Sequence, residues 1–169
     1  MSHSRQERLD NIDQLIQILM ERTSPNWVKM SICETTDPAL TKIFPTSWSD
    51  ARGLGYVQQV SGFRSHYQLT GTGWVKGLEL NGILNAPDFN TMLGKVCKSL
   101  KDLVKGREQA GRIDIEIIAR QTEIAVGMIS NIIEANLIET RLGRSGATWA
   151  KGFGGKWIVV PIDFGLEPL

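Results

Sequence analysis

The chain has 169 residues, a length that accommodates one large domain or two small ones. Hydrophobic residues make up 41% and charged residues 22% of the chain, ordinary proportions for a protein with a packed core. The formal net charge of +1 excludes binding to a polyanion through global charge, so any contact with nucleic acid must come from a local basic patch.

The N-terminal stretch and the cysteines indicate the compartment. The stretch MSHSRQERLDNIDQ is polar and lacks the apolar core of a signal peptide, and no apolar run is long enough to span a bilayer. Cys33 and Cys97 lie far apart, each in an apolar setting, as reduced and buried thiols of a cytosolic protein would. We therefore expect a soluble, cytoplasmic protein that makes no contact with a membrane.

The N-terminal part predicts one long amphipathic helix and then shorter ones. Apolar residues recur at intervals of three and four over residues 5–22, which indicates a helix with one buried face. These residues are Leu9, Ile12, Leu15, Ile16, Leu19 and Met20. The segments TSP and TTDPALTKIF each place a capping residue before a proline, as at the start of a short helix. The segment TSWSDARGLGYV can hold another helical turn before its glycines end it.

Two strands and a capped helix follow in the first half. Residues 56–60 are rich in β-branched and aromatic side chains, and the segment HYQL is a second short extended piece. The segment SGF between them can form a hairpin turn. In LTGTGWVKGLEL, Thr70 is a candidate N-cap for a further helix. The segment NGILNAPD, residues 81–88, is dense in turn-forming residues and predicts a linker between two domains.

The second half opens with another amphipathic helix, predicted over residues 89–109. Its apolar positions are Leu93, Val96, Cys97, Leu100 and Val104. The helix carries five basic and two acidic residues, which makes it the most positive segment of the chain. The five cations are Lys95, Lys98, Lys101, Lys105 and Arg107. They form either a solvated surface face or part of a phosphate-binding surface.

The segment IEIIARQTEIAVGMISNIIEANL predicts two short helices, with a break over residues 122–125 and a second helix over residues 126–136. Two helices that meet at a sharp turn need a small residue at their crossing and apolar residues at fixed offsets. Ala119 is that small residue, and the isoleucines supply the apolar wedge. The segment resembles a helix-turn-helix motif. Glu123 stands where the turn of that family usually has glycine, so it must tolerate the turn geometry.

The segments LIETRL and KWIVVPIDF, predicted to be extended, flank a glycine-rich cationic stretch directly after this motif. Two strands joined by a flexible basic loop resemble the wing of a winged helix-turn-helix domain, and the resemblance covers residues 89–169. Within the stretch, AKGFGGKW nearly matches a phosphate-binding P-loop. A P-loop precedes a helix and ends in serine or threonine, whereas here a strand follows and Trp157 takes the hydroxyl position. We therefore expect a hairpin with cations at its tip, not a nucleotide site.

The first half resembles the same family over a shorter motif. HYQLTGTGW matches the Y-x-L-T-x-x-G pattern found where the wing strand of many winged-helix regulators passes into their last helix. The matching residues are Tyr67, Leu69, Thr70 and Gly73. The resemblance implies a first winged-helix-like domain over residues 5–80. The expected fold class is therefore mainly α with small β-hairpins (α+β), arranged as two winged helix-turn-helix domains in tandem.

The resemblance implies a duplex-DNA-binding protein of the transcription-regulator type. In this family the second helix of the motif enters the major groove, so the exposed face of residues 126–136, which would include Met128, would read base edges. Asn131 can pair with adenine, and Ser130 can contact a base or a phosphate. The expected phosphate contacts are Arg120 and Gln121 near the turn, and Arg141, Arg144, Lys151 and Lys156 in the wing.

The main alternative is a protein-interaction module without DNA binding, because fold alone does not determine function. The near-neutral charge and the acidic Glu134 on the second helix favour it. So do three tryptophans that are candidates for exposure, Trp27, Trp48 and Trp74. Trp149 and Phe153 either stack on nucleic acid or fold back on the core. A homodimer is compatible with both functions, through the helix from Arg5 or the helix from Phe89.

An enzyme is not expected. His3 and His66 have no cysteine or acidic cluster at metal-ligand spacing. Ser65 is adjacent to His66, and neighbouring strand residues point to opposite faces of a sheet, so the two do not form a catalytic pair. We therefore expect no catalytic residues, no metal and no cofactor.

Overall fold

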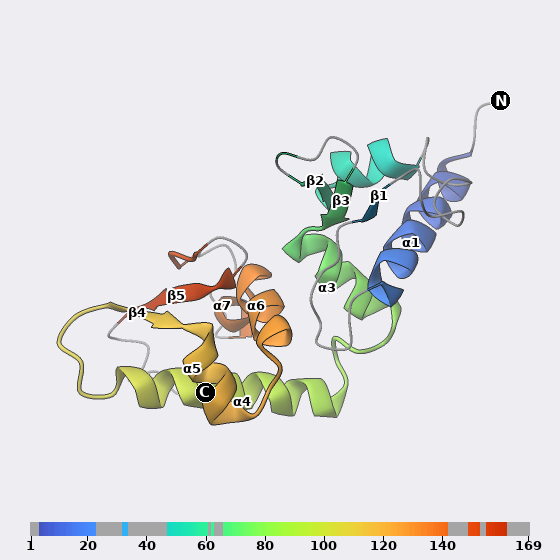
Figure 1. Ribbon diagram of the computed structural model, residues 1–169. Coiled ribbons are helices and arrows are strands. Elements are labelled where there is room, and N and C mark those ends of the chain that lie inside the picture. The colour runs from blue at the N-terminus through green and yellow to red at the C-terminus, as the bar shows by residue number, and fades with distance from the viewer. Residues whose placement is uncertain are drawn as a thin grey trace. The chain divides into compact units, whose positions relative to one another are not determined.

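The computed structural model of the protein is shown in Figure 1. It describes residues 4–22, 32–33, 47–60, 62, 66–141, 149–152 and 155–161. The chain divides into two compact units, Met1–Leu84 and Asn85–Leu169, and the division falls within the segment 81–88. Each unit combines helices with a small antiparallel sheet, so the fold is of the mixed α+β type that the sequence predicts.

The first unit begins with helix α1 (Arg5–Glu21), which confirms the predicted amphipathic helix. Ser4 caps it, because its hydroxyl accepts a hydrogen bond from the Glu7 N–H at 3.2 Å. The Glu7 carboxylate in turn accepts one from the Ser4 N–H at 2.6 Å, which completes a capping box. The buried face of the helix consists of Ile12, Leu15, Ile16, Leu19 and Met20.

A three-stranded antiparallel sheet follows in the first unit. Its strands are β1 (Ile32–Cys33), β2 (Val57–Gln59) and β3 (His66–Leu69). β3 lies between the other two and pairs with both. The strands predicted over residues 56–60 and in HYQL are confirmed, whereas β1 was not predicted. Residues 47–53 form the predicted helical turn, which ends before Gly55 at a φ of 75°.

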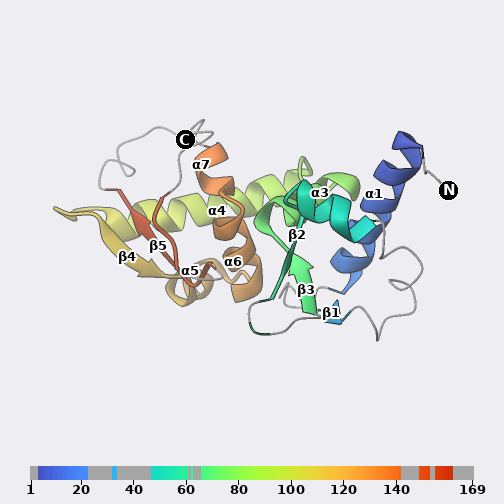
Figure 2. The same cartoon turned by 90° about the horizontal axis from the view of Figure 1, so that it is seen from above.

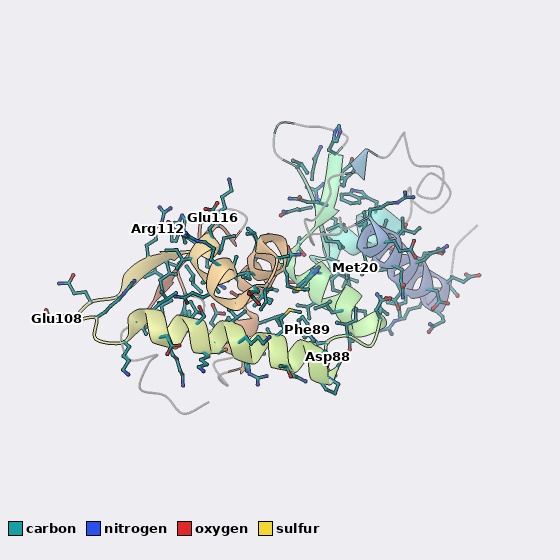
Figure 3. All side chains as sticks on the ribbon, turned by 60° about the horizontal axis from the view of Figure 1, so that its bottom comes forward. Met20, Asp88, Phe89, Glu108, Arg112 and Glu116 are labelled. Carbon is teal, nitrogen blue, oxygen red and sulfur yellow. The ribbon has the colours of Figure 1, made fainter. Side chains whose placement is uncertain are left out.

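Helix α3 (Gly71–Leu80) packs against α1 and completes the first unit (Figure 1). Thr70 is confirmed as its N-cap, because its hydroxyl accepts a hydrogen bond from the Gly73 N–H at 3.0 Å. A side chain at position 73 would collide with the Tyr56 carbonyl oxygen, and one at position 77 would collide with Met20, which is labelled in Figure 3. The absence of side chains on α3 at these two positions therefore allows its close packing.

The three tryptophans proposed as exposed differ in their surroundings. Trp74 is fully buried, so the prediction is wrong for this residue. Trp48 is half-buried, and the centroid of its ring lies 3.8 Å from that of Tyr67. Trp27 lies outside the described residues, as do the segments TSP and TTDPALTKIF, in which the sequence predicts short helices.

The second unit begins with the long helix α4, which runs from Pro87 to Val104. Its apolar face is buried as predicted, but it ends at Val104 and not at Gln109. Gly106 takes a φ of 79°, and this left-handed residue turns the chain out of the helix. Four elements follow before the hairpin: β4 (Gly111–Asp114), α5 (Ile115–Thr122), α6 (Val126–Glu134) and α7 (Leu137–Arg141). The sequence did not predict β4.

The segment LIETR is helical, so the prediction that it is extended is wrong. Asn136 takes a φ of 57° and ends α6, and its carbonyl oxygen accepts a hydrogen bond from the Thr140 N–H at 3.0 Å. Leu137, Ile138 and Glu139 are buried in succession, so burial does not alternate as it would in a half-buried strand. Two apolar residues followed by a charged one fit a strand and a helical turn equally well, and tertiary packing selects the turn.

The last strand of the second unit, β5 (Trp157–Val160), follows α7. It pairs antiparallel with β4, and the two strands lie side by side in Figures 1 and 2. On its other edge β5 contacts residues 149–152: the Val159 N–H donates to the Ala150 carbonyl at 2.8 Å, and the Gly152 N–H donates to the Trp157 carbonyl at 2.9 Å. β5 therefore lies between β4 and residues 149–152.

Cys97 belongs to the core of the second unit, where its side chain is fully buried. Burial raises the pKa of the Cys97 thiol, while the charges of Arg141 and Lys101 oppose the shift. The thiol therefore stays protonated and unreactive at neutral pH, as predicted for a structural cysteine.

Candidate nucleic-acid interface

A single left-handed residue, Glu123, forms the sharp turn between α5 and α6. Glu123 takes φ 58° and ψ 25°, a left-handed conformation, and its N–H donates to the Ala119 carbonyl at 2.9 Å. Ile118, Ile129 and Ile132 are fully buried. The expectation that a non-glycine residue must tolerate this turn is confirmed, at a cost of about 1 kcal/mol for a left-handed residue with a side chain.

A polar groove beside this turn brings together two of the predicted site residues, Arg120 and Gln121. It lies between α4 and α5, and Lys95, Lys98 and Ser99 of α4 line its opposite side. Ser99 Oγ donates a hydrogen bond to Gln121 Oε1 at 2.6 Å, which joins the two helices. Arg120, Lys95 and Lys98 are exposed. Asp102 and Glu123 line the same groove, so three cations face two acids there.

The two lysines of this groove belong to the five helix cations for which the sequence left open a solvated face or a phosphate-binding surface. They lie on α4, and α5 begins at Ile115, so the groove joins segments that are far apart in the chain. The available signal was the excess of basic residues on the predicted helix over residues 89–109. That excess could not distinguish the lysines beside the turn from those elsewhere on the helix.

The face of α6 differs from the prediction. Asn131 and Met128 each expose only 2% of their surface, so the prediction that they lie on an open face is wrong. Ser130 is half-buried and lies close to Gly155. A side chain at position 155 would collide with the Ser130 carbonyl and lie 3.0 Å from Ser130 Oγ. Val126 is the most open residue of the helix, with 43% of its surface exposed.

The first turn of α6 also lacks a side-chain cap among the residues that the structure describes. The N-cap of the helix is Ala125, and no side chain of the described residues caps the first-turn N–H groups. A shallow hollow at this end is lined by residues of α5, of the turn and of the start of α6, among them Arg120, Ile124 and Val126. Free first-turn amides attract anions, because the N-terminus of a helix carries a partial positive charge.

Lys151 does not stand at the tip of the hairpin, so the prediction that places it there is wrong. Its ammonium group donates to the Ile133 carbonyl at 2.8 Å and to Asn136 Oδ1, and it forms an ion pair of 2.8 Å with Glu139 Oε1. The Lys151 side chain is 14% exposed and that of Glu139 is 0% exposed. The buried ammonium group stabilises the partial negative charge at the C-terminal end of α6 and donates hydrogen bonds to two oxygen acceptors there.

Glu139 has further contacts in this buried cluster. Its Oε1 accepts a hydrogen bond from the Trp149 N–H at 3.4 Å. Its Oε2 has no hydrogen-bond partner among the described residues. Trp149 is 9% exposed and thus folds back on the core, which decides between the two alternatives for this residue. Phe153 lies outside the described residues.

The remaining predicted cations are dispersed. Arg141 is exposed at the end of α7, and its Nη1 donates to Asn90 Oδ1 at 3.4 Å. Lys156 is exposed just before β5, and Arg144 lies outside the described residues. Arg112 on β4, labelled in Figure 3, was not predicted. It lies 5.2 Å from the centre of the Trp157 ring and forms an ion pair of 2.8 Å with Asp114.

These observations define a candidate interface of two parts: the groove of Lys95, Lys98, Arg120 and Gln121, and the open start of α6. No protein-family model matches the chain, and no curated protein or solved structure is significantly similar to it. No described helix is both long and apolar enough to cross a bilayer.

Proposed function

We propose that the second unit is a winged helix-turn-helix domain and that it binds duplex DNA. Its elements follow the order helix, strand, two helices at a sharp turn, and hairpin, with one short extra helix before the hairpin. The last strand, β5, lies between β4 and residues 149–152. The first unit has the same position for its last strand, β3, which supports a second domain of this type, arranged in tandem.

The observation that carries the proposal is the groove beside the turn. Lys95, Lys98 and Arg120 converge there from two helices, and all three are exposed. Lysine and arginine bind the phosphate backbone, and such contacts supply most of the sequence-independent affinity for DNA. When the DNA backbone binds in this groove, the adjacent turn and the start of α6 lie against the duplex.

The start of α6 supplies the second set of contacts. Its uncapped N–H groups can bind a phosphate oxygen, and the exposed Val126 side chain can contact the methyl group of a thymine. Residues at the N-terminal end of the second helix are those that reach base edges in this class of motif. Asn131 and Lys151 are excluded as DNA contacts, because the first is buried and the second is paired inside the domain.

Titration of fluorescent duplex DNA with the full chain, at several salt concentrations, tests this proposal. The triple variant Lys95→Ala/Lys98→Ala/Arg120→Ala should weaken binding to all sequences alike. It should also lower the slope of log K against log salt by about 2 to 3, since each phosphate contact contributes about 0.9.

Lys105→Ala is the matched control, because Lys105 is exposed beyond the end of α4 and does not line the groove. This variant should retain the salt slope of the unmodified chain. The proposal fails if the unmodified chain binds no duplex at low salt, or if Lys105→Ala lowers the slope as much as the triple variant does.

A protein-interaction module is the second candidate function. The observation that favours it is the composition of α6, VGMISNIIE, which has no basic residue and ends in Glu134. A helix of this kind gives no electrostatic attraction to phosphate along most of its length. Stoichiometric capture of a protein partner by a chain that has no affinity for duplex DNA would select this function.

A further inference from the structure

A hollow in the first unit collects exposed apolar side chains. It lies between α1 and the helical residues 47–53 and has a volume of about 440 Å³. Leu9 and Leu54 line it, with 42% and 51% of their surfaces exposed, and the buried Ile12 lines it as well. Val126 is the other large apolar side chain that is exposed in the described part of the chain. Two of three such residues in one hollow are typical of an interaction surface.

An ion pair fixes the two walls of this hollow. Arg8 of α1 donates from Nε to Asp50 Oδ2 at 2.8 Å and from Nη2 to Asp50 Oδ1 at 2.5 Å. The paired hydrogen bonds give the contact a defined geometry. Both residues line the hollow, so the position of Leu54 relative to Leu9 is set before any partner binds.

Two residues of opposite charge flank Leu9 along α1. Arg5, Leu9 and Asp13 follow one another at four-residue spacing, which places them along one stripe of the helix. The side chains of Arg5 and Asp13 make no hydrogen bond or ion pair with the residues that the structure describes. The exposed leucine therefore has an available positive charge one turn before it and an available negative charge one turn after it.

We propose that two copies of the chain pair through this hollow, with their α1 helices antiparallel about a two-fold axis at Leu9. Each Leu9 then enters the other copy's hollow beside the leucine at position 54, Arg5 faces the partner's Asp13, and Asp13 faces the partner's Arg5. A stripe with one positive and one negative end is complementary to itself when turned by 180°. A surface for an acidic or basic partner would instead carry charges of one sign on both sides.

Sedimentation velocity of the full chain over a range of concentrations tests the pairing. The unmodified chain should pass from monomer to dimer as its concentration rises. Leu54→Glu should weaken the dimer at least about a hundredfold, because it places a charge in the apolar centre of the interface. The side chain at position 54 is already half exposed, so folding should be retained, which circular dichroism checks.

Val126→Glu is the matched control, because Val126 is an apolar residue of similar exposure, 43%, in the second unit. This variant should dimerise like the unmodified chain. A chain that is monomeric at every concentration overturns the proposal, as does a dimer that Val126→Glu weakens as much as Leu54→Glu does.

Charge exchange tests the antiparallel arrangement itself. Arg5→Asp and Asp13→Arg should each weaken the dimer about tenfold, because the two-fold axis creates two like-charge contacts from one substitution. The double variant Arg5→Asp/Asp13→Arg should recover the affinity of the unmodified chain. Additive weakening in the double variant would exclude this pairing, even if a dimer forms by another surface.

Discussion

The two units of the chain share a strand arrangement but stabilise it differently. In both, the last strand, β3 or β5, lies between two earlier segments. In the first unit α3 contacts β3 and packs on α1, where Gly77 allows the close approach of Met20, and Trp74 of α3 is buried. The second unit attaches its hairpin through a buried ion pair between Lys151 and Glu139.

The placement of charge separates the two units most clearly. The Arg8–Asp50 pair of the first unit is on the surface, where water screens it, whereas the Lys151–Glu139 pair of the second unit is inside. Surface pairs contribute little to the free energy of unfolding, while loss of one partner from a buried pair is costly. Similar strand order thus does not imply a similar response to substitution.

The largest expected effect is the loss of the buried cation. Lys151→Ala should lower the free energy of unfolding of the second unit by about 3 to 5 kcal/mol, because it leaves Glu139 charged, buried and unpaired. Hydrogen exchange in increasing urea should report this loss in β5 and α6 and none in α3. Lys151→Met/Glu139→Leu should recover most of the stability, and a cost below about 1 kcal/mol for the single variant would show that the pair is not buried.

A smaller effect is expected from two glycines, one in each unit. Gly73→Ala should destabilise the first unit by about 2 kcal/mol, because its new methyl group would meet the Tyr56 carbonyl. Gly94→Ala should stabilise the second unit by about 0.5 to 1 kcal/mol, since it lies within α4 and nothing surrounds its missing side chain. Thermal unfolding measures both shifts, and shifts of the same sign would contradict this difference.

The turn residue of the second unit should give a change of similar size. Glu123→Gly should stabilise that unit by about 0.5 to 1 kcal/mol, because glycine adopts the left-handed conformation without strain. Glu123→Ala removes the same charge but keeps the strained backbone, so urea unfolding should show little gain for it. Equal stabilisation by both variants would assign the effect to charge and not to conformation.

The smallest effect concerns pH in the first unit. The hydrogen bond from Arg8 lowers the pKa of Asp50, so the folded carboxylate holds protons less tightly than the unfolded one. Its contribution is therefore present above the ordinary carboxyl pKa of about 3.9 and is lost as the pH falls through the lowered value. Asp50→Asn should flatten the acid limb of the unfolding curve of the first unit, whereas an unchanged limb would show that the pair contributes nothing.

The parts of the fold predicted from the sequence are those with local causes. α1, the two strands of the first hairpin, the Thr70 cap and the α5–α6 turn depend on spacing and capping within a few residues. β4 is short and begins with a glycine, and α7 begins with buried residues that suit either a strand or a helix. Tertiary contacts decide these two elements, and local pattern does not contain such contacts.

The candidate site was predicted less well than the fold. Arg120 and Gln121 were identified because they border the turn, but Lys95 and Lys98 reach the same groove from a distant helix. The side chains of Asn131 and Lys151 are polar in the sequence and turned inward in the structure. Polarity predicts exposure only on average, and buried polar groups with partners are the exceptions to it.

The Lys151–Glu139 pair has a consequence for how the hairpin forms. Neighbouring residues of a strand point to opposite faces, so a slip of one residue along β5 would put Ala150 or Gly152 opposite Glu139. The carboxylate would then be enclosed without a counter-ion, and each misaligned hairpin would be unstable. The pair therefore favours the correct strand register. It destabilises misaligned strand pairings more than it stabilises the correct one.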